Sequence, residues 1–449
     1  MAKKVVILTS GSRGDVQPYV ALGLELEGRG ASVSICTEAR QKAFVESFGL
    51  KYAELAGDPF GLLAVLSARA RAKLLAEGKI MKVMAAAGKH NAPFADAVLA
   101  SAAAACGGAD VVVTAALTQT PSMCVAEKLG VPWVPVFLGP VWPTREFCSW
   151  ALSTQPWRWK WANKASYKLL LGALWMQEKT RINKWRTQEL GLRALAGGPM
   201  AVASSGEVPV VLMCTPHATP GQARPPDYPE FVQYTGFAFV PPADEAAIEL
   251  RLREFIAAGA APVYLGFGSM PAPEPQRLLR LAAEVVRLTG KRAVLAAGWS
   301  GVNGAADGGS GGGGGEALPP ELLVVAAAPH DWLLPRCCAA VHHAGIGTCA
   351  AALRAGVPSV PCPVMLDQPW NAARLVEAGC AGPPLPFMEM TAEALAARIN
   401  AVSGDDAMRA RARAVADDIA TGWRGAAAAA DAVLAAPNPW PKLAAARVV

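Results

Sequence analysis

The sequence has no uninterrupted apolar run of the ~18 residues that a membrane-spanning helix needs. Its first residues, MAKKVVILTSGSRGD, contain too short an apolar stretch for a secretory signal peptide. None of the ten cysteines belongs to a Cys-x-x-Cys pair, which argues against a zinc ribbon or a thioredoxin-type site. These absences predict a cytoplasmic protein without a transmembrane segment, whose cysteines are buried free thiols.

A large excess of one charge is also missing. Lys and Arg total 42, Asp and Glu total 36, and the net charge is +6. This excess is too small to predict a nucleic-acid partner, and no nucleic-acid-binding motif accompanies it. Hydrophobic residues make up 53% of the chain and charged residues 17%, so disorder of the whole chain is excluded.

Two series of alternating strand and helix patterns predict an α/β protein with two Rossmann-like, parallel-sheet domains. In each series a short β-branched run is followed by a Gly/Ser loop, a helical pattern and another strand. The first series has strands at 5–8, 31–37, 111–114 and 131–139. The second has strands at 263–269, 292–298, 322–329, 338–345 and 356–364, with an amphipathic helix at 274–290.

The Pro-rich stretch 216–246 suggests the link between the domains. We therefore predict an N-terminal domain over 1–235, a C-terminal domain over 246–410 and a helical tail over 411–449. The low-complexity run 304–317 has eight glycines among its 14 residues and is expected to be a disordered surface loop, not a phosphate-binding loop.

One region, 142–194, departs from an ordinary α/β pattern. Residues 142–185 contain seven of the 13 tryptophans, and residues 145–194 have a net charge of +7, so the remainder of the chain sums to −1. Tryptophan interleaved with Lys and Arg suits a membrane surface at headgroup level, or an apolar acceptor pocket with a positive rim. The alternative is a helical insertion whose tryptophans pack onto the first domain.

The first candidate site is Gly11-Ser12-Arg13-Gly14-Asp15, directly after the first strand. Ligands of parallel sheets bind at this carboxyl end of the strands. The spacing is GxxG and not GxGxxG, which disfavours a nicotinamide oxidoreductase. Asp15 is either a helix N-cap or an accepting carboxylate, whose pKa the helix dipole is expected to lower.

The second candidate site, His342-His343-Ala344-Gly345-Ile346-Gly347-Thr348, follows a strand and precedes a helix. Backbone N–H groups at such a helix start can bind an anion, and a histidine can donate to a phosphate oxygen. Adjacent residues of a strand point to opposite faces, so the two histidines are poorly placed to share a metal ion, and one of them is expected to be structural.

Two weaker motifs accompany it. Ser269 follows a glycine turn in GFGSM, and Asp367-Gln368 follows another strand. A carboxylate beside an amide suits hydrogen bonding to sugar hydroxyls. Alone, the pair could equally be a solvated loop.

Together these segments resemble the sterol 3-β-glucosyltransferases and the bacterial glycosyltransferases of antibiotics. The N-terminal likeness covers about residues 4–60, and the C-terminal likeness covers VYLGFGSM and APHDWLLPRCCAAVHHAGIGTCAAALRAGVPSVPCPVMLDQPWNA. The resemblance implies a GT-B fold, with two Rossmann-like domains facing across a cleft. It also implies inverting transfer of a hexose, expected to be glucose, from UDP-glucose to a hydroxyl of a sterol or other lipid alcohol, at a site that contacts a membrane peripherally.

The resemblance also assigns roles by position. Asp15 would be the general base that deprotonates the acceptor hydroxyl. The diphosphate would be bound by Ser269, His343, Gly345, Gly347 and Thr348. Asp367 and Gln368 would bind the hexose, and His330 and Trp332 would lie near the uracil.

The chain departs from the family pattern at several positions. Ala344 and Leu366 stand where relatives have glycine, and Ala351 replaces the ribose-binding Glu of the plant secondary-metabolite enzymes. No Asp-x-Asp pair is present, whereas metal-dependent sugar transferases commonly use one to hold Mg²⁺ or Mn²⁺. We therefore expect no metal site and no cofactor, with the UDP-sugar acting as co-substrate.

Three other functions remain open at this point. The acceptor could be a soluble small aglycone, such as a polyketide. The protein could be a nucleotide-sugar epimerase, although the aromatic insertion argues against this. It could also be a non-catalytic protein that binds lipid or nucleotide-sugar.

Overall fold

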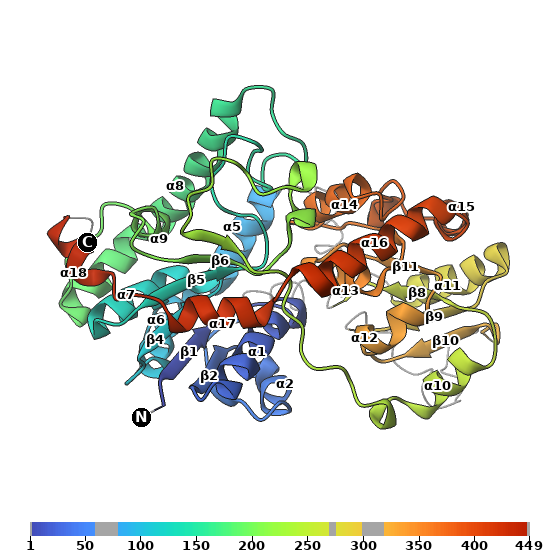
Figure 1. Ribbon diagram of the computed structural model, residues 1–449, viewed down its shortest axis with the longest axis horizontal. Helices are drawn as coiled ribbons and strands as arrows, with labels where there is room; N and C mark the ends of the chain where they lie inside the picture. The colour runs from blue at the N-terminus through green and yellow to red at the C-terminus, as the bar shows by residue number, and fades with distance from the viewer. Residues whose placement is uncertain (1, 59–79, 269–274, 299–317, 447–449) are drawn as a thin grey trace. The chain divides into compact units, whose positions relative to one another are not determined.

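The computed structural model describes residues 2–58, 80–268, 275–298 and 318–446 (Figure 1). The chain forms two compact units. The boundary at which the chain leaves unit 1 for most of unit 2 falls between Val240 and Pro241, inside the stretch predicted to link the domains. Each unit contains one parallel β-sheet with helices on it, so the predicted α/β class with two Rossmann-like sheets is confirmed.

Unit 1 contains a seven-stranded sheet in the order β3-β2-β1-β4-β5-β6-β7, in which every pairing is parallel. Its strands are β1 (Lys4–Leu8), β2 (Ser32–Thr37), β3 (Lys51–Glu54), β4 (Val111–Thr114), β5 (Trp133–Phe137), β6 (Val210–Leu212) and β7 (Val232–Tyr234). Its helices include α1 (Arg13–Gly28), α2 (Lys42–Glu46), α6 (Ala95–Ala105), α7 (Gln119–Leu129), α8 (Lys160–Trp185), α9 (Pro199–Ala203), α17 (Ala426–Leu434) and α18 (Trp440–Ala445). Helix α5 (Ile80–Asn91) belongs to this unit from Ala85 onward.

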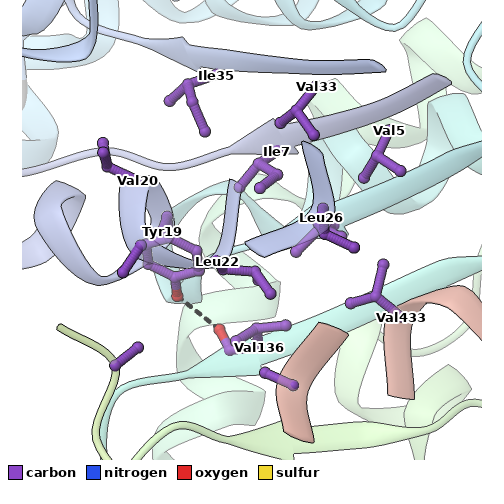
Figure 2. Close-up of a cluster of buried hydrophobic side chains, with 14 of the residues drawn as sticks. Val5, Ile7, Tyr19, Val20, Leu22, Leu26, Val33, Ile35, Val136 and Val433 are labelled. Atoms are coloured by element: carbon purple, nitrogen blue, oxygen red, sulfur yellow. Dashed lines mark hydrogen bonds between the residues drawn. The ribbon is translucent and has the colours of Figure 1, made fainter. Parts of the chain in front are cut away.

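The core of unit 1 lies between the sheet and helix α1. Val5 and Ile7 of β1 alternate into it and meet Leu22 and Leu26 of α1, all four fully buried (Figure 2). Tyr19 is also buried there, and its hydroxyl donates to the Val136 carbonyl over 2.7 Å, as the dashed line in Figure 2 shows. This bond satisfies a polar group in the core and ties α1 to β5.

Unit 2 contains a five-stranded parallel sheet in the order β10-β9-β8-β11-β12. Its strands are β8 (Val263–Gly266), β9 (Ala293–Ala296), β10 (Leu322–Val325), β11 (Ala339–His342) and β12 (Ser359–Pro361). Its helices are α10 (Leu250–Ala257), α11 (Pro275–Thr289), α12 (His330–Leu333), α13 (Ile346–Ala355), α14 (Gln368–Glu377), α15 (Ala392–Ser403) and α16 (Asp406–Gly422).

The predicted C-terminal tail, 411–449, is divided between the two units. Helix α16 packs on α13 in unit 2, whereas α17 packs on α1 in unit 1. The alanine-rich α17 buries Ala429, Ala430 and Val433 in the core of unit 1. The tail is therefore part of both folds, because its apolar residues complete a core that the first 240 residues leave open.

The structure bears on two predictions, the state of the cysteines and the absence of a membrane-spanning helix. All ten cysteines are free, and nine of them are buried, as predicted. Within the part of the chain that the structure describes, no helix combines the length and the apolar character needed to cross a membrane.

Candidate active site

The loop between β1 and α1 brings the Asp15 carboxylate to the carboxyl edge of the first sheet. Ser12 is the N-cap of α1 and Asp15 occupies the third helical position, so the two form a capping box. One of the two predictions for Asp15, that it is the helix N-cap, is therefore wrong, because Ser12 holds that position. Its Oδ2 accepts hydrogen bonds from the Ser12 backbone N–H at 2.7 Å and from the Ser12 hydroxyl at 2.8 Å. Among the described residues nothing donates to Oδ1, which leaves that oxygen for a substrate.

Burial raises the pKa of Asp15, although the two hydrogen bonds from Ser12 act in the opposite direction. The expectation that the helix dipole would lower this pKa is therefore wrong. Glu38 nearby adds repulsion between like charges, and Arg40 partly offsets it. A carboxylate whose pKa is raised holds a proton more readily, which is the property that a general base needs.

Glycine is required at position 11 because its backbone lies against Asp15. Gly11 has φ +140°, and a Cβ there would lie 2.5 Å from Asp15 Oδ2 and 2.7 Å from Asp15 Cβ. The Gly11 carbonyl is held by Arg40 at 2.8 Å and by Gln41 at 3.0 Å. The loop is thus fixed from both sides, and the carboxylate has little freedom to move.

Glu38 is a buried residue of this site that the sequence reasoning missed. Its carboxylate accepts from the Ser10 hydroxyl, from the Thr37 hydroxyl at 2.9 Å and from the Gly11 N–H at 3.3 Å. Glu38 directly follows β2, the neighbour of β1 in the sheet. Its position at the carboxyl end of an adjacent parallel strand was the signal that could have found it.

A cavity of about 270 Å³ opens beside this loop in unit 1. Its wall includes Ser10 and Thr118 next to the loop, apolar side chains such as Leu99, and Glu178 and Arg181 of α8. The Thr120 hydroxyl donates to Glu178 over 2.6 Å, and burial raises the pKa of Glu178. A mainly apolar cavity with a few polar groups is typical of a small-molecule site.

In unit 2, three neighbouring strands end at one edge of the sheet and bring the other candidate residues together. Strand β11 lies between β8 and β12, with His342 opposite Gly266 on one side and Pro361 on the other. The segments after these strands hold Gly268, His343 and Asp367. This edge is also the point where the strand order reverses direction, where ligands of such sheets bind.

The two adjacent histidines have different environments. His342 is fully buried, and its Nδ1 accepts the Ala344 N–H at 3.2 Å. His343 is half-buried between two glycines: a Cβ on Gly268 would lie 2.7 Å from its Cε1, and a Cβ on Gly345 would lie 2.5 Å from its Nε2. The prediction that one of the two histidines is structural therefore matches the placement of His342.

Burial lowers the pKa of His342 to about 3 and that of His343 to about 4, with the charge of His330 contributing to both. Both rings are neutral near pH 7. A neutral ring keeps one N–H, so His343 can donate a hydrogen bond without bringing a positive charge into the site.

His343 lies beside the start of α13. Gly345 is the N-cap of this ten-residue helix, and Gly347 and Thr348 are in its first turn, where backbone N–H groups have no partner within the helix. Ala344 has φ +62° and Leu366 has φ +57°, so the residues that replace glycine in both loops adopt the left-handed conformation that glycine favours. The loops keep their shape despite the substitutions.

Asn371 connects the two loops and was not selected from the sequence. Its side-chain amide donates to the Ala344 carbonyl at 3.0 Å and to Asp367 Oδ2 at 2.8 Å. Gln368 is buried, and its Oε1 accepts the N–H groups of Val364 at 2.8 Å and Met365 at 3.1 Å. A change in one loop is therefore transmitted to the other.

The residues predicted near the uracil take up packed positions. His330 shares a hydrogen bond of 2.8 Å between its Nε2 and the Tyr264 hydroxyl. Trp332 is only 8% exposed, packs in a core cluster and has the Arg336 guanidinium over its ring at 4.4 Å. This environment favours a packing role for Trp332 over a stacking surface for a base.

Two predicted features lie outside the described residues, namely Ser269 and the glycine-rich run 304–317. No cluster of three or more His, Cys, Asp or Glu side chains suited to a metal ion occurs over 2–58, 80–268, 275–298 and 318–446.

The lowered histidine pKa values predict a loss of stability in acid. The unfolded chain has histidines of ordinary pKa near 6.5, whereas the folded values are about 3 and 4. Unfolding therefore takes up protons below about pH 6.5, and the free energy of unfolding falls as the pH drops from there towards 4. Urea unfolding at pH 7.5 and pH 5 measures this loss. In His342→Gln the difference between the two pH values should be smaller; an equal difference would contradict the assignment.

Comparisons with known proteins agree with this arrangement. Residues 5–148 match the glycosyltransferase family 28 N-terminal domain, and residues 310–432 match the C-terminal domain of erythromycin biosynthesis protein CIII-like proteins. A sterol 3-beta-glucosyltransferase of Arabidopsis thaliana is 30% identical over 88% of this chain and 62% of its own length. The chain thus spans about three fifths of the plant relatives that it matches.

Solved structures share the fold at low identity. The glycosyltransferase of kitacinnamycin superposes with a TM-score of 0.69 at 19% identity, covering 97% of this chain and 100% of the other. The glycosyltransferase VinC, solved in complex with dTDP, gives 0.64 at 19% identity, covering 96% and 99%. The predicted GT-B fold class, with one parallel sheet in each of two units, is therefore confirmed.

Proposed function

We propose that the chain transfers a hexose from a UDP-sugar to a hydroxyl of a lipid alcohol, because it matches a family 28 glycosyltransferase N-terminal domain and an EryCIII-like C-terminal domain. The observation that carries the proposal is the position of His343. Its neutral ring lies between two glycines, beside the free N–H groups of α13 and within the edge formed by β8, β11 and β12.

In the proposed reaction unit 2 binds the donor. His343 and the backbone of Gly345, Gly347 and Thr348 contact the diphosphate, and Ser269 is assigned to the same ligand from its sequence motif alone. The leaving diphosphate gains negative charge, and preorganised N–H donors at a helix start stabilise that charge. A nucleoside diphosphate is the proposed ligand of this edge, and the proposal is supported by the glycosyltransferase VinC, which has the same fold and was solved in complex with dTDP. The uracil is proposed near His330 and Trp332, with Trp332 supporting the wall.

Asp367 and Gln368 are proposed to bind the hexose hydroxyls. The link from Asn371 to both Asp367 and the Ala344 carbonyl supports this, because it fixes the carboxylate relative to the diphosphate loop. Sugar and leaving group would then be held in one geometry, which favours in-line attack at the anomeric carbon.

Asp15 is proposed as the general base. It takes the proton of the acceptor hydroxyl while that oxygen bonds to the anomeric carbon, and the UDP leaves with the electron pair of the broken C–O bond. Attack opposite the leaving group inverts the anomeric configuration. The unoccupied Oδ1 and the raised pKa of Asp15 support this role. We also propose that no divalent metal is required, since α13 and His343 supply the donors.

We infer glucose as the hexose and a sterol or similar lipid as the acceptor, since the Arabidopsis relative carries the name of a sterol 3-beta-glucosyltransferase. The cavity lined by Ser10 is the proposed acceptor site. A soluble aglycone is the second candidate, because the kitacinnamycin enzyme has the same fold. The polar pair Glu178 and Arg181 in the cavity wall gives such an acceptor groups to bind.

The test uses the purified protein, radiolabelled UDP-glucose and a sterol in mixed micelles, with and without EDTA. Label in the lipid phase, undiminished by EDTA, is the expected result. Binding of UDP-glucose without labelled lipid would overturn the sterol acceptor and direct the test to soluble aglycones. A protein that neither binds UDP-glucose nor transfers its sugar would overturn the proposed function. Activity that is lost in EDTA and returns when a metal is restored would overturn metal independence.

A glycine pair tests whether Asp15 must be held in place. Gly11→Ala puts a Cβ about 2.5 Å from Asp15 Oδ2, so the carboxylate must move. We expect transfer to fall by about 10²-fold, as displacements of about 1 Å commonly cost. Gly14→Ala is the matched control, since its Cβ would approach only the Ser12 hydroxyl at 3.6 Å. Initial rates of both variants decide it; similar rates would contradict the requirement.

A further inference from the structure

Exposed apolar side chains are concentrated in one short part of unit 1. Of the twelve large hydrophobic residues exposed among the described residues, six fall between positions 152 and 176. Trp159, Trp161, Leu169 and Met176 are each more than 60% exposed. Such a concentration on a soluble surface marks a site of interaction.

Helix α8 has two different faces. Its buried face packs against the rest of unit 1 through residues such as Tyr167, Leu170 and Trp175. Its opposite face presents Trp161, Leu169 and Met176 at helical spacing. We call this second face, together with the preceding turn that carries Trp157 and Trp159, the α8 surface. The sequence alternatives of packing and exposure are therefore both realised, by different tryptophans of the same region.

The α8 surface is held rigidly. The buried Asn163 side chain accepts the Trp157 N–H at 2.9 Å and donates to the carbonyls of Arg145 at 3.0 Å and Trp157 at 3.2 Å. These bonds fix the backbone of the turn before α8, so a partner that binds the exposed tryptophans does not have to order that turn first.

Basic side chains border the same surface. Arg158 and Lys168 are exposed, and no acidic partner for either is found among the described residues. Lys160 pairs with Glu146 at 2.9 Å but is still 67% exposed, and Lys164 is 4.0 Å from Asp227. Four of the ten basic residues of 145–194 therefore lie within 157–169, the part of the chain that carries the exposed tryptophans.

We propose that the α8 surface binds the surface of an anionic lipid bilayer, with its tryptophans at headgroup depth. Indole rings favour that depth, and lysines and arginines beside them attract anionic headgroups. The contact would lie in the plane of the bilayer surface, as it does for interfacial helices with one apolar and one basic face. Surfaces that bind another protein usually have few charged side chains at their centre, so the lysines and arginines here favour a bilayer over a protein partner.

This proposal rests on the proposed function only for its purpose, which is access to a lipid acceptor; binding itself is independent of catalysis. The protein is mixed with sedimentable vesicles of phosphatidylcholine alone or with 30% phosphatidylserine, roughly the composition that gives a strongly negative surface. We expect sedimentation with the anionic vesicles, weakened by 0.5 M salt because screening shortens to roughly 4 Å.

Two variants test the surface. The double variant Trp159→Ala/Trp161→Ala should reduce vesicle affinity at least about tenfold, because two large apolar side chains no longer enter the interface. Arg158→Glu/Lys168→Glu should abolish the preference for anionic vesicles. Leu250→Ala, an exposed leucine of unit 2, and Lys42→Glu, an exposed lysine, are the matched controls and should bind as the parent does.

The outcomes separate this proposal from the proposed function. Glucosyl transfer to a short-chain, water-soluble alcohol is measured for the same variants and should be unchanged. Variants that bind vesicles as the parent does, or a parent that stays in the supernatant with both vesicles, would overturn the α8 surface. Vesicle binding without any transfer would instead overturn the function and leave the surface in place.

Discussion

Replacing Asp15 with asparagine is expected to lower the rate of glucosyl transfer by about 10²–10⁴-fold, the usual contribution of a positioned general base. Asparagine has nearly the same shape, and its side-chain oxygen can still accept from the Ser12 N–H and hydroxyl, which the carboxylate accepts at 2.7 and 2.8 Å. The start of α1 is therefore kept while the proton acceptor is lost. Initial rates with UDP-glucose and a micellar sterol measure the effect.

The pH profile separates the base from the cap. Because burial raises the pKa of Asp15, the parent rate should fall with acid along a limb that lies above the ordinary aspartate value of 3.8. The residual rate of Asp15→Asn should lack that limb. Ser12→Ala is the control, since it removes one donor to Asp15 and should lower thermal stability by about 1 kcal/mol while retaining most activity. An Asp15→Asn enzyme with the parent's rate would reduce Asp15 to a capping residue.

The features that the sequence predicted well are those expressed in local pattern. Strand periodicity identified both parallel sheets, and a motif after β1 and another after β11 identified the two edges that hold Asp15 and His343. Strand alternation also separated His342 from His343. Each of these inferences depends on neighbours in the chain, which a sequence displays directly.

The features that it missed depend on distant segments. Glu38 belongs to the Asp15 loop because β2 pairs with β1. Asn371 lies 27 residues after Ala344 and joins the loop that holds Ala344 to the loop that holds Asp367. The raised pKa of Asp15 follows from burial, which outweighs the two hydrogen bonds from Ser12 that lower it. The division of the tail between the units follows from the core that α17 completes.

The paired histidines provide the sharpest test of the donor site. His343→Ala is expected to reduce transfer by about 10²–10³-fold, since loss of one preorganised donor to developing negative charge costs this much. Affinity for UDP-glucose should fall with it, because the ring is proposed to contact the ground-state diphosphate too. Since the ring is half-buried between two glycines, its removal should change thermal stability little.

His342→Ala should have the opposite effect, although the two residues are adjacent. His342 is fully buried and its Nδ1 accepts the Ala344 N–H, so truncation leaves a cavity and an unsatisfied donor. Such changes commonly cost a few kcal/mol of about 5–15 available. Calorimetry and the specific rate of the folded fraction at low temperature distinguish the two variants. Equal losses of rate, or equal losses of stability, would show that the strand does not divide the pair into one donor and one structural ring.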